Sequence, residues 1–246
     1  MIVNGNKSGG GVDYASPPQI SFDGKWSGWH IEVYNGTPYW EALFATSGTL
    51  VSLAQYIADL WGIGGGGAGD SFYQSGYDYG NGGGSGYTNM VENVTISAGG
   101  HAVSIGAGST ALGSQGGSTK FLDLTCEGGY GGSSSGKNGG NGGSNGATSG
   151  KTGGENGSPG DGKIMSKFWS TEHNTEYGAG GKPGEDDNNG GGGGGYLDVG
   201  APTSTSGHGY GGGGGGGDNP TDGYQSQMYY DWQGKSGCLV ARIKAA

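Results

Sequence analysis

The chain has 246 residues and a formal net charge of −10, with 66 glycines and only 30% hydrophobic residues. So much glycine excludes a conventional core of large side chains throughout the chain, and the negative charge argues against nucleic acid or an anionic membrane as a partner. Aromatic residues are nevertheless frequent, with 15 tyrosines and 6 tryptophans, which favours a folded chain because disordered chains are usually poor in aromatics. No apolar run is long enough to span a bilayer, so we expect no membrane insertion.

The beginning of the chain is polar, and we interpret residues 1–24 as an N-terminal arm or attachment segment. Two runs typical of β-strands follow, residues 29–34 and 37–44, on either side of Asn35 and Gly36. An Asn-Gly pair is the two-residue turn typical of a hairpin, because both residues readily adopt the positive φ angles that match the twist of the strands. The sequence therefore predicts a β-hairpin here.

Two short apolar runs come next. Residues 49–53 and 57–63 are apolar enough to form half-buried strands. A helix over residues 51–60 is the alternative that the pattern leaves open.

Three later runs complete the predicted β-core. Residues 94–96 and 102–105 are rich in β-branched side chains and predict a second hairpin. Residues 120–125 predict one further strand, and the alternating run 238–243 predicts the strand that closes the chain. Because more than a hundred residues separate this last strand from the others, we interpret the intervening region as an insertion whose ends the β-core holds together.

The insertion, residues 127–237, has glycine at every third position in short phased runs. A period of three matches the left-handed helix with three residues per turn found in polyproline II and collagen. The phase slips and the chain has only 7 prolines, which disfavours a collagen triple helix. Glycine helices can instead stack closely and pair their backbone N–H and C=O groups with neighbouring helices. We therefore predict a bundle of polyglycine helices, with a flexible Gly/Ser linker as the alternative.

Two pure glycine runs, residues 190–195 and 211–217, are predicted to lie inside this bundle. A helix that is surrounded on all sides tolerates no side chain in any phase. The predicted structural glycines are Gly190, Gly193, Gly195, Gly211, Gly214 and Gly217.

The predicted fold class is all-β plus polyglycine II: a small antiparallel β-core with a long inserted bundle of polyglycine helices and little or no α-helix. The predicted organisation has an arm at residues 1–24, a β-core with the first glycine loops at 25–126, the polyglycine bundle with recognition loops at 127–237, and the closing strand at 238–246.

The sequence offers no pattern typical of catalysis, a metal site or a cofactor. Cys126 and Cys238 are far apart without a CxxC motif, so we expect two buried free thiols. The acidic residues 185–187, and Asp218 with Asp222, lack the spacing of calcium-binding loops. The histidines have no metal-binding spacing, and three near matches to a phosphate-binding loop each fail at a required position. We therefore predict no enzyme activity, no cofactor and no metal.

Aromatic residues interrupt the glycine pattern in residues 164–177, 197–210 and 219–232. Rigid aromatics with small polar neighbours are typical of loop-built recognition surfaces. The alternative is that the rings only seal the helix bundle. The candidate recognition residues are Phe168, Trp169, His173, Tyr177, His208, Tyr210, Tyr224, Tyr229, Tyr230 and Trp232.

Several segments in a fixed order resemble a known family. They are residues 39–50 (YWEALFATSGTL), residues 60–67 (LWGIGGGG), the run 94–105, Tyr210 with its polyglycine run, and residues 237–243. In this order they resemble the glycine-rich domain of bacteriophage tail proteins, over residues 39–244. The last glycine run is also similar to that of distal adhesins of T-even-like phages, and a weaker likeness connects the chain to the glycine-rich extracellular domain of anaplastic lymphoma kinase receptors.

The resemblance to the phage proteins implies a sandwich of polyglycine helices whose loops contact the host surface. On this basis we expect an adhesin of the virion tail or tail fibre, synthesised in the host cytoplasm, that recognises a bacterial outer-surface protein or glycan and contacts other tail subunits. A homotrimer is left open. The main alternative is a purely structural tail or fibre cap, and ice binding or glycan depolymerisation are further alternatives.

Overall fold

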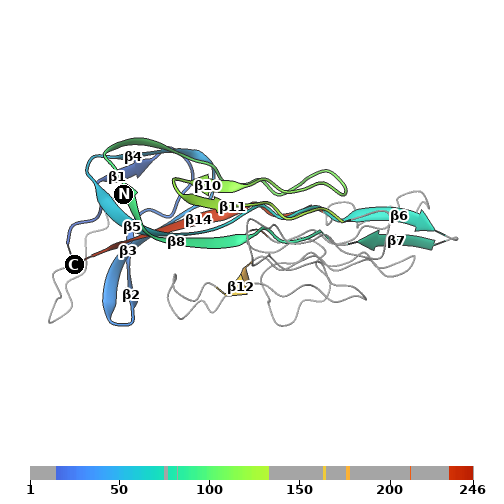
Figure 1. Cartoon of the computed structure of the whole chain (residues 1–246), viewed down its shortest axis with the longest axis horizontal. Helices are drawn as coiled ribbons and strands as arrows, with labels where there is room; N and C mark the ends of the chain where they lie inside the picture. Colours follow the sequence, from blue (N-terminus) through green and yellow to red (C-terminus); the bar gives the residue numbers. More distant parts are fainter. Residues whose placement is uncertain are drawn as a thin grey trace.

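The structure is a computed structural model, and it describes residues 15–74, 77–81, 83–132, 163–164, 176–177, 211 and 233–245. This part of the chain is all-β and contains no α-helix, which confirms the predicted fold class at that level. Antiparallel sheets form one end of the described molecule, and glycine-rich segments run side by side away from them (Figure 1).

The larger sheet has five antiparallel strands, in the order β2 (His30–Tyr34), β3 (Thr37–Phe44), β14 (Cys238–Lys244), β5 (Tyr56–Ile63) and β8 (Thr88–Ile96). The strand predicted near the end of the chain is confirmed as β14, which lies in the centre of the sheet between β3 and β5 (Figure 1). Its first six residues are all buried, as expected for a central strand covered on both faces.

The predicted hairpin at Asn35 and Gly36 is confirmed. Strands β2 and β3 pair antiparallel with Tyr34 opposite Thr37. Asn35 and Gly36 have φ angles of 49° and 76°. Positive φ at both turn positions is the type I′ geometry, whose twist matches that of the flanking strands.

The smaller sheet has three antiparallel strands, in the order β1 (Ile20–Phe22), β4 (Gly48–Ser52) and β9 (Gly99–Val103). Strand β1 lies within residues 1–24, the segment interpreted as an arm. The alternative of a helix over residues 51–60 is wrong, because β4 and β5 occupy this region.

The main hydrophobic core combines buried side chains from both sheets. Removing these side chains from water stabilises the two-sheet arrangement. The smaller sheet contributes Ile20, Leu50 and Val103, and the larger sheet contributes Ala42, Phe44, Ala58, Leu60, Val94, Ile96, Leu239, Ala241 and Ile243.

The predicted hairpin between residues 94–96 and 102–105 is wrong, although both strands form. Strand β8 pairs with β5, and β9 pairs with β4, so the two strands belong to different sheets. The chain crosses between the sheets before Gly99, whose φ is 124°. This crossing buries Ile96 and Val103 in the shared core from the two sheets, which a local hairpin would not achieve.

The single strand predicted over residues 120–125 is also wrong, because the chain folds back within it. Strand β10 (Thr119–Phe121) pairs with β11 (Leu124–Cys126), and Leu122 in the turn has a φ of 48°. Folding back buries both Phe121 and Leu124 in the main core. Two short ladders complete the described strands: β6 (Asp70–Gln74) with β7 (Tyr77–Asn81), and β12 (Lys163–Ile164) with β13 (Glu176–Tyr177).

Beyond the sheets, the chain forms a set of glycine-rich segments that we call the glycine stack. Its segments precede or follow strands of the sheets, so it continues directly from the β-core (Figure 1). The glycine stack consists of residues 64–69, 83–87, 106–109, 113–117, 127–132 and 233–237, together with Gly211.

Backbone hydrogen bonds in the glycine stack repeat every three residues. Gly64 and Gly67 both donate to the segment 83–87, with N···O distances of 3.1 and 2.9 Å. Gly65 and Ala68 both donate to the segment 113–117, at 2.9 and 3.0 Å. This repeat is what an extended helix with three residues per turn produces, because each turn presents its groups in the same directions.

Residues 64–69 form the centre of the glycine stack. Gly66 donates to Lys235 O at 2.8 Å, Gly65 O accepts from Gly129 N at 2.8 Å, and Gly66 O accepts from Ser109 N at 3.0 Å. The central segment is thus bonded to every other segment of the stack, and all its residues are buried. Backbone pairing therefore orders this region, with almost no contribution from large side chains.

Candidate functional site

The structure describes little of the predicted recognition surface itself. Tyr177 belongs to β13, which pairs with β12 and so joins the two ends of the interruption 164–177. Of the predicted structural glycines, Gly211 is described. The other predicted site residues lie outside the described part of the chain: Phe168, Trp169, His173, His208, Tyr210, Tyr224, Tyr229, Tyr230, Trp232, Gly190, Gly193, Gly195, Gly214 and Gly217.

Gly132 and Lys235 flank residues 133–232 in the sequence, and both are bonded to the central segment of the glycine stack. Gly132 N donates to Ala68 O at 2.9 Å, and Lys235 O accepts from Gly66 N at 2.8 Å. Residues 133–232, which hold all the predicted recognition residues, therefore start and end at one rigid base. Loops presented by a rigid scaffold are common binding elements.

The close approach between segments explains why this base is made of glycine. A Cβ on Gly65 would collide with the carbonyl group of Ala107, and one on Gly67 would collide with the carbonyl group of Tyr130. Both obstacles are backbone atoms, which cannot rotate away as a side chain can. Any larger residue at these positions would therefore push neighbouring segments apart.

Gly211 occupies a comparable position far along the sequence. Its N–H donates to Ser236 O at 2.8 Å, and its C=O accepts from Gly86 N at 2.9 Å. Gly211 is buried, and both of its backbone polar groups are bonded to the glycine stack.

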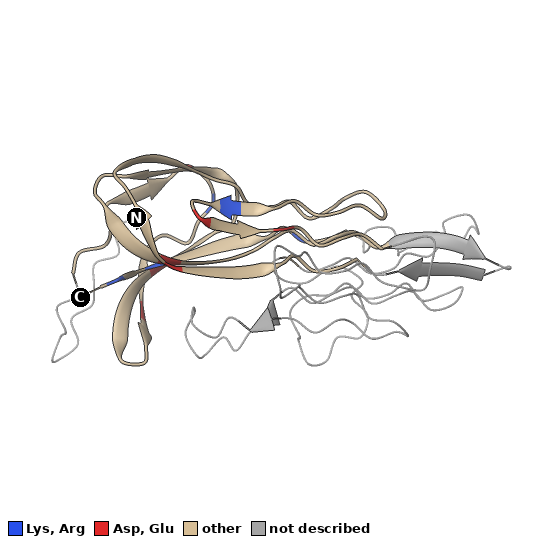
Figure 2. Ribbon diagram, viewed as in Figure 1, with Lys and Arg blue, Asp and Glu red and all other residues tan. Residues whose placement is uncertain are grey.

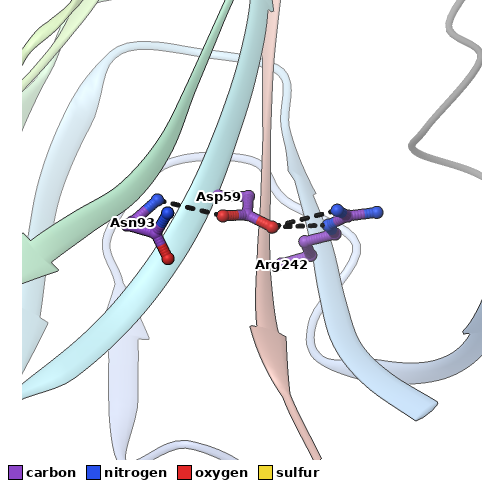
Figure 3. A network of polar contacts seen from close by, with 3 residues as sticks. All are labelled: Asp59, Asn93 and Arg242. Atoms are coloured by element: carbon purple, nitrogen blue, oxygen red, sulfur yellow. Dashed lines mark hydrogen bonds and ion pairs between the residues drawn. The ribbon is translucent and has the colours of Figure 1, made fainter. Parts of the chain in front are cut away.

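An ion pair between Arg242 and Asp59 joins two strands of the larger sheet (Figure 3). Nε and Nη2 of Arg242 both donate to Asp59 Oδ2, at 3.0 and 2.9 Å. Asp59 Oδ1 accepts from the backbone N–H of Asn93 at 3.0 Å. The Arg242 guanidinium also lies over the rings of Tyr39 and Tyr34, at 4.5 and 5.6 Å from their centroids.

The position of Asp59 gives this ion pair a structural role. Asp59 lies where the register between β5 and β8 shifts, so the ladder is irregular there. The carboxylate bridges Asn93 on β8 and Arg242 on β14, and it therefore stabilises the sheet on both sides of β5. Because these contacts join neighbouring strands, the ion pair is suited to holding the sheet rather than to chemistry.

Further ionisable residues lie beside Arg242 on the neighbouring strands β3 and β2 of the larger sheet. Glu41 on β3 is opposite both Arg242 on β14 and His30 on β2. Glu41 is buried, with 2% of its surface exposed, and His30 Nε2 lies 3.5 Å from Glu32 Oε1. Buried charges require partners, so this arrangement is consistent with a structural polar layer.

The two cysteines confirm the prediction of buried free thiols. Cys126 belongs to the main core, whereas Cys238 lies in a second apolar cluster on the other face of the larger sheet. Burial raises the pKa of the Cys126 thiol from 9.0 to about 12, opposed in part by a backbone hydrogen bond at Asn89. Burial, with a smaller contribution from Cys126, also raises the pKa of Cys238 well above its ordinary value. Thiols that stay protonated are poor nucleophiles, so neither is suited to catalysis.

An aromatic cluster closes one side of the core. The rings of Trp26 and Phe44 are stacked with centroids 5.6 Å apart, and Trp29 and Phe22 meet Trp26 edge to face. Trp29 Nε1 is buried and has no hydrogen-bond partner within the described structure. These rings pack against the main core, so their role is to cover the core at the edge of the sheets.

Charge is distributed unevenly over the described residues. Lys, Arg, Asp and Glu gather in the sheets, whereas the glycine stack has only Glu127 and Lys235 of these four residue types (Figure 2). In the described ranges, no group of three or more His, Cys, Asp or Glu residues could hold a metal ion. The same residues include no helix of the length and apolar character needed to cross a membrane.

Comparison with known protein families and with curated proteins finds no match to this chain.

Sequence reasoning missed two features of this region. Residues 64–67 were assigned to loops of the β-core, yet they form the centre of the glycine stack, bonded to segments that all come later in the sequence. The four consecutive glycines at residues 64–67 were the sequence pattern that could have indicated this role. The ion pair of Arg242 was also missed, and its signal was a charged residue between the apolar residues Ala241 and Ile243 of strand β14.

Proposed function

We propose that the protein is a binding protein of a bacteriophage tail or tail fibre that recognises a bacterial surface protein or glycan through loops in residues 133–232. The observation that carries this proposal is the anchoring of both ends of that region in the glycine stack. A rigid base lowers the entropy lost when loops bind, which is how preorganised recognition surfaces gain affinity.

Further observations support the proposal. The β12–β13 ladder joins the ends of the interruption that contains Phe168, Trp169 and His173. The threefold hydrogen-bond repeat of the described stack supports the idea that residues 127–237 continue as a bundle of polyglycine helices. The resemblance to glycine-rich phage tail proteins supports a location in the virion and contacts with other tail subunits. We propose a binding protein rather than an enzyme, and no cofactor is needed for this role.

Adsorption of the purified protein to a panel of bacterial isolates tests this function. We expect the parent to adsorb to some isolates, and the double variant Trp169→Ala with Tyr177→Ala to adsorb much more weakly at an unchanged melting temperature. The melting temperature is the control for folding. If the parent adsorbs to no isolate, the chain is better explained as a structural tail or fibre cap. If the double variant unfolds, the rings are seals of the bundle instead.

A further inference from the structure

The edge strands of the two main sheets differ in how well they could pair with another chain. An edge strand offers unpaired N–H and C=O groups to a further strand unless a local feature opposes pairing. Strand β1 has only three residues, β9 begins with two glycines, and β8 is interrupted at Asn93, whose φ is 59°. Strand β2 has none of these features, so it is the edge best suited to accept a neighbour.

The composition and exposure of β2 are those of a strand that can gain a partner. Its sequence is HIEVY, in which isoleucine, valine and tyrosine have high strand propensity. Val33 is 55% exposed. Within the described ranges, β3 is the only strand that pairs with β2, and the hairpin of β2 and β3 extends away from the smaller sheet (Figure 1).

The pairing of β2 with β3 determines which backbone groups point towards the free edge. Tyr34 and Thr37 flank the two-residue turn, where opposite residues exchange hydrogen bonds across the hairpin. Bonded and non-bonded pairs alternate along an antiparallel ladder, so the N–H and C=O groups of Ile31 and Val33 point away from β3. Pro38, which is opposite Val33, has no N–H to donate to β2, and this agrees with the alternation.

A second copy of β2 could pair antiparallel in registers that bring different side chains together. A register centred on Ile31 places His30 of each copy opposite Glu32 of the other. A register centred on Glu32 places two carboxylates opposite each other, and one centred on Val33 places Glu32 opposite Tyr34. Like charges directly opposite are destabilising, whereas an imidazole N–H can donate to a carboxylate. The register centred on Ile31 is therefore the most favourable.

We propose that the protein forms a two-fold homodimer in which the β2 strands of two copies pair antiparallel about Ile31. The two larger sheets then become one continuous sheet. His30 Nε2 lies 3.5 Å from Glu32 Oε1 of its own strand, so in the dimer each imidazole lies between two carboxylates. On the opposite face, the Ile31 side chains of the two copies meet, and Val33 lies opposite Trp29 of the second copy. The dimer does not depend on the proposed binding function.

Sedimentation equilibrium of the full chain tests the dimer, over about 1–100 μM protein at about 0.15 M salt. At this ionic strength, the repulsion between two copies that each have a net charge of −10 is screened beyond about 8 Å. We expect the parent to show a reversible equilibrium between monomer and dimer.

Two substitutions of Val33 separate edge pairing from other effects. Val33→Pro removes an outward N–H and places a ring at the edge, so it should raise the dissociation constant by about tenfold or more. The matched control is Val33→Thr, which keeps the N–H and the branched side chain and should change the constant by less than about threefold.

Single-cysteine variants test the register, including the case in which Val33→Pro also weakens the hairpin. Opposite residues of a hydrogen-bonded antiparallel pair have Cα atoms about 5.5 Å apart, which is within the range of a disulfide. With oxidised glutathione, Ile31→Cys should form a cross-linked dimer on a non-reducing gel, and Val33→Cys should not. The parent is the background control, because Cys126 and Cys238 are buried.

Three results would overturn the inference. A parent that stays monomeric over the whole concentration range would show that β2 does not pair with a second copy. A dimer with the same dissociation constant in Val33→Pro as in the parent would place the interface elsewhere. Cross-linking of Val33→Cys, or of neither cysteine variant, would show that the copies do not pair about Ile31.

Discussion

The sheets and the glycine stack are ordered by opposite means. In the sheets, large side chains such as Phe44 and Leu60 are fully buried against one another. In the stack, Gly65 is surrounded by backbone, and its N–H and C=O are bonded to different neighbouring segments. The first region is sensitive to lost side-chain volume, and the second is sensitive to any added volume. The chain therefore contains two cores: smaller residues destabilise the first, and larger residues destabilise the second.

The difference also explains how the two cores are joined. Strands β5, β8 and β14 each continue directly into or from a segment of the glycine stack. A sheet aligns its strands side by side, and the same alignment places the glycine segments close enough to pair their backbones. The sheets thus hold the glycine segments in alignment. The segments would not align readily on their own, because glycine loses much backbone entropy on ordering.

The largest effect should come from adding a side chain to the centre of the stack. Gly65→Ala places a methyl group against the carbonyl group of Ala107 and separates the bonds of Gly65 to Gly117 and Gly129. Two broken bonds leave buried groups unpaired at about 1–3 kcal/mol each, so we expect a loss of about 4 kcal/mol or more in the free energy of unfolding.

The matched control is Gly100→Ala on β9, where an added Cβ would meet only Thr49 Cγ2 at an ordinary 3.7 Å. Urea unfolding of both variants measures the difference. Similar stabilities for the two variants would contradict the idea of a backbone-packed core.

Removing side-chain volume from the sheets should have the next largest effect. Phe44 is fully buried and contacts the rings of Trp26 and Phe22. Phe44→Ala should cost about 3–5 kcal/mol, because it loses buried apolar area and leaves a cavity. Thermal and urea unfolding would measure this loss, and a change below about 1 kcal/mol would show that the sheets are not the side-chain-packed region.

Breaking the ion pair of β5 and β14 should have a moderate effect. Asp59→Ala leaves Arg242 without this carboxylate and Asn93 N without its acceptor. We expect a loss of about 1–2 kcal/mol, because the Asp59 side chain is 19% exposed and water replaces part of the interaction. Asp123→Ala, at an exposed turn position, is the control and should change stability by less than about 0.5 kcal/mol. Equal effects would remove the structural role assigned to the ion pair.

The buried thiols should have no effect at neutral pH and an effect only in alkali. The pKa of Cys126 is raised from 9.0 to about 12 in the folded protein, so the unfolded chain ionises first as the pH rises. Stability should therefore be constant below about pH 9 and fall between about pH 9 and 12, by up to about 1.4 kcal/mol per pH unit for each thiol.

Cys126→Ala should reduce this slope, as measured by urea unfolding at several pH values. Rapid alkylation of the native protein at pH 8 would be inconsistent with burial of the thiols.

Much of the β-core could be predicted because its signals are local. Asn35 and Gly36 specify their turn through their own backbone preferences, and the apolar runs of β4, β5 and β14 identify strands. Pairing could not be predicted in the same way. Strands β8 and β9 look like a hairpin in sequence, but burying Ile96 and Val103 in one core requires them to separate into two sheets.

The glycine stack was only partly predictable for a related reason. Three-residue glycine periodicity indicates the type of helix that such segments can form. It does not identify neighbours, because segments without side chains carry no pattern that specifies their partners. The bonds between residues 64–69 and segments as distant as 233–237 depend on how the sheets align the chain. The recognition residues beyond Gly132 remain a prediction from sequence.

The most direct test of this account is amide hydrogen exchange of the parent protein, comparing Gly65 and Gly129 in the stack with Leu239 and Ala241 in β14. If backbone pairing makes the stack a core, its glycine amides should exchange slowly, with protection that approaches that of the central strand. If the glycine amides exchange at the rate of an unstructured chain while β14 stays protected, the stack is not a core and cannot serve as the rigid base for binding.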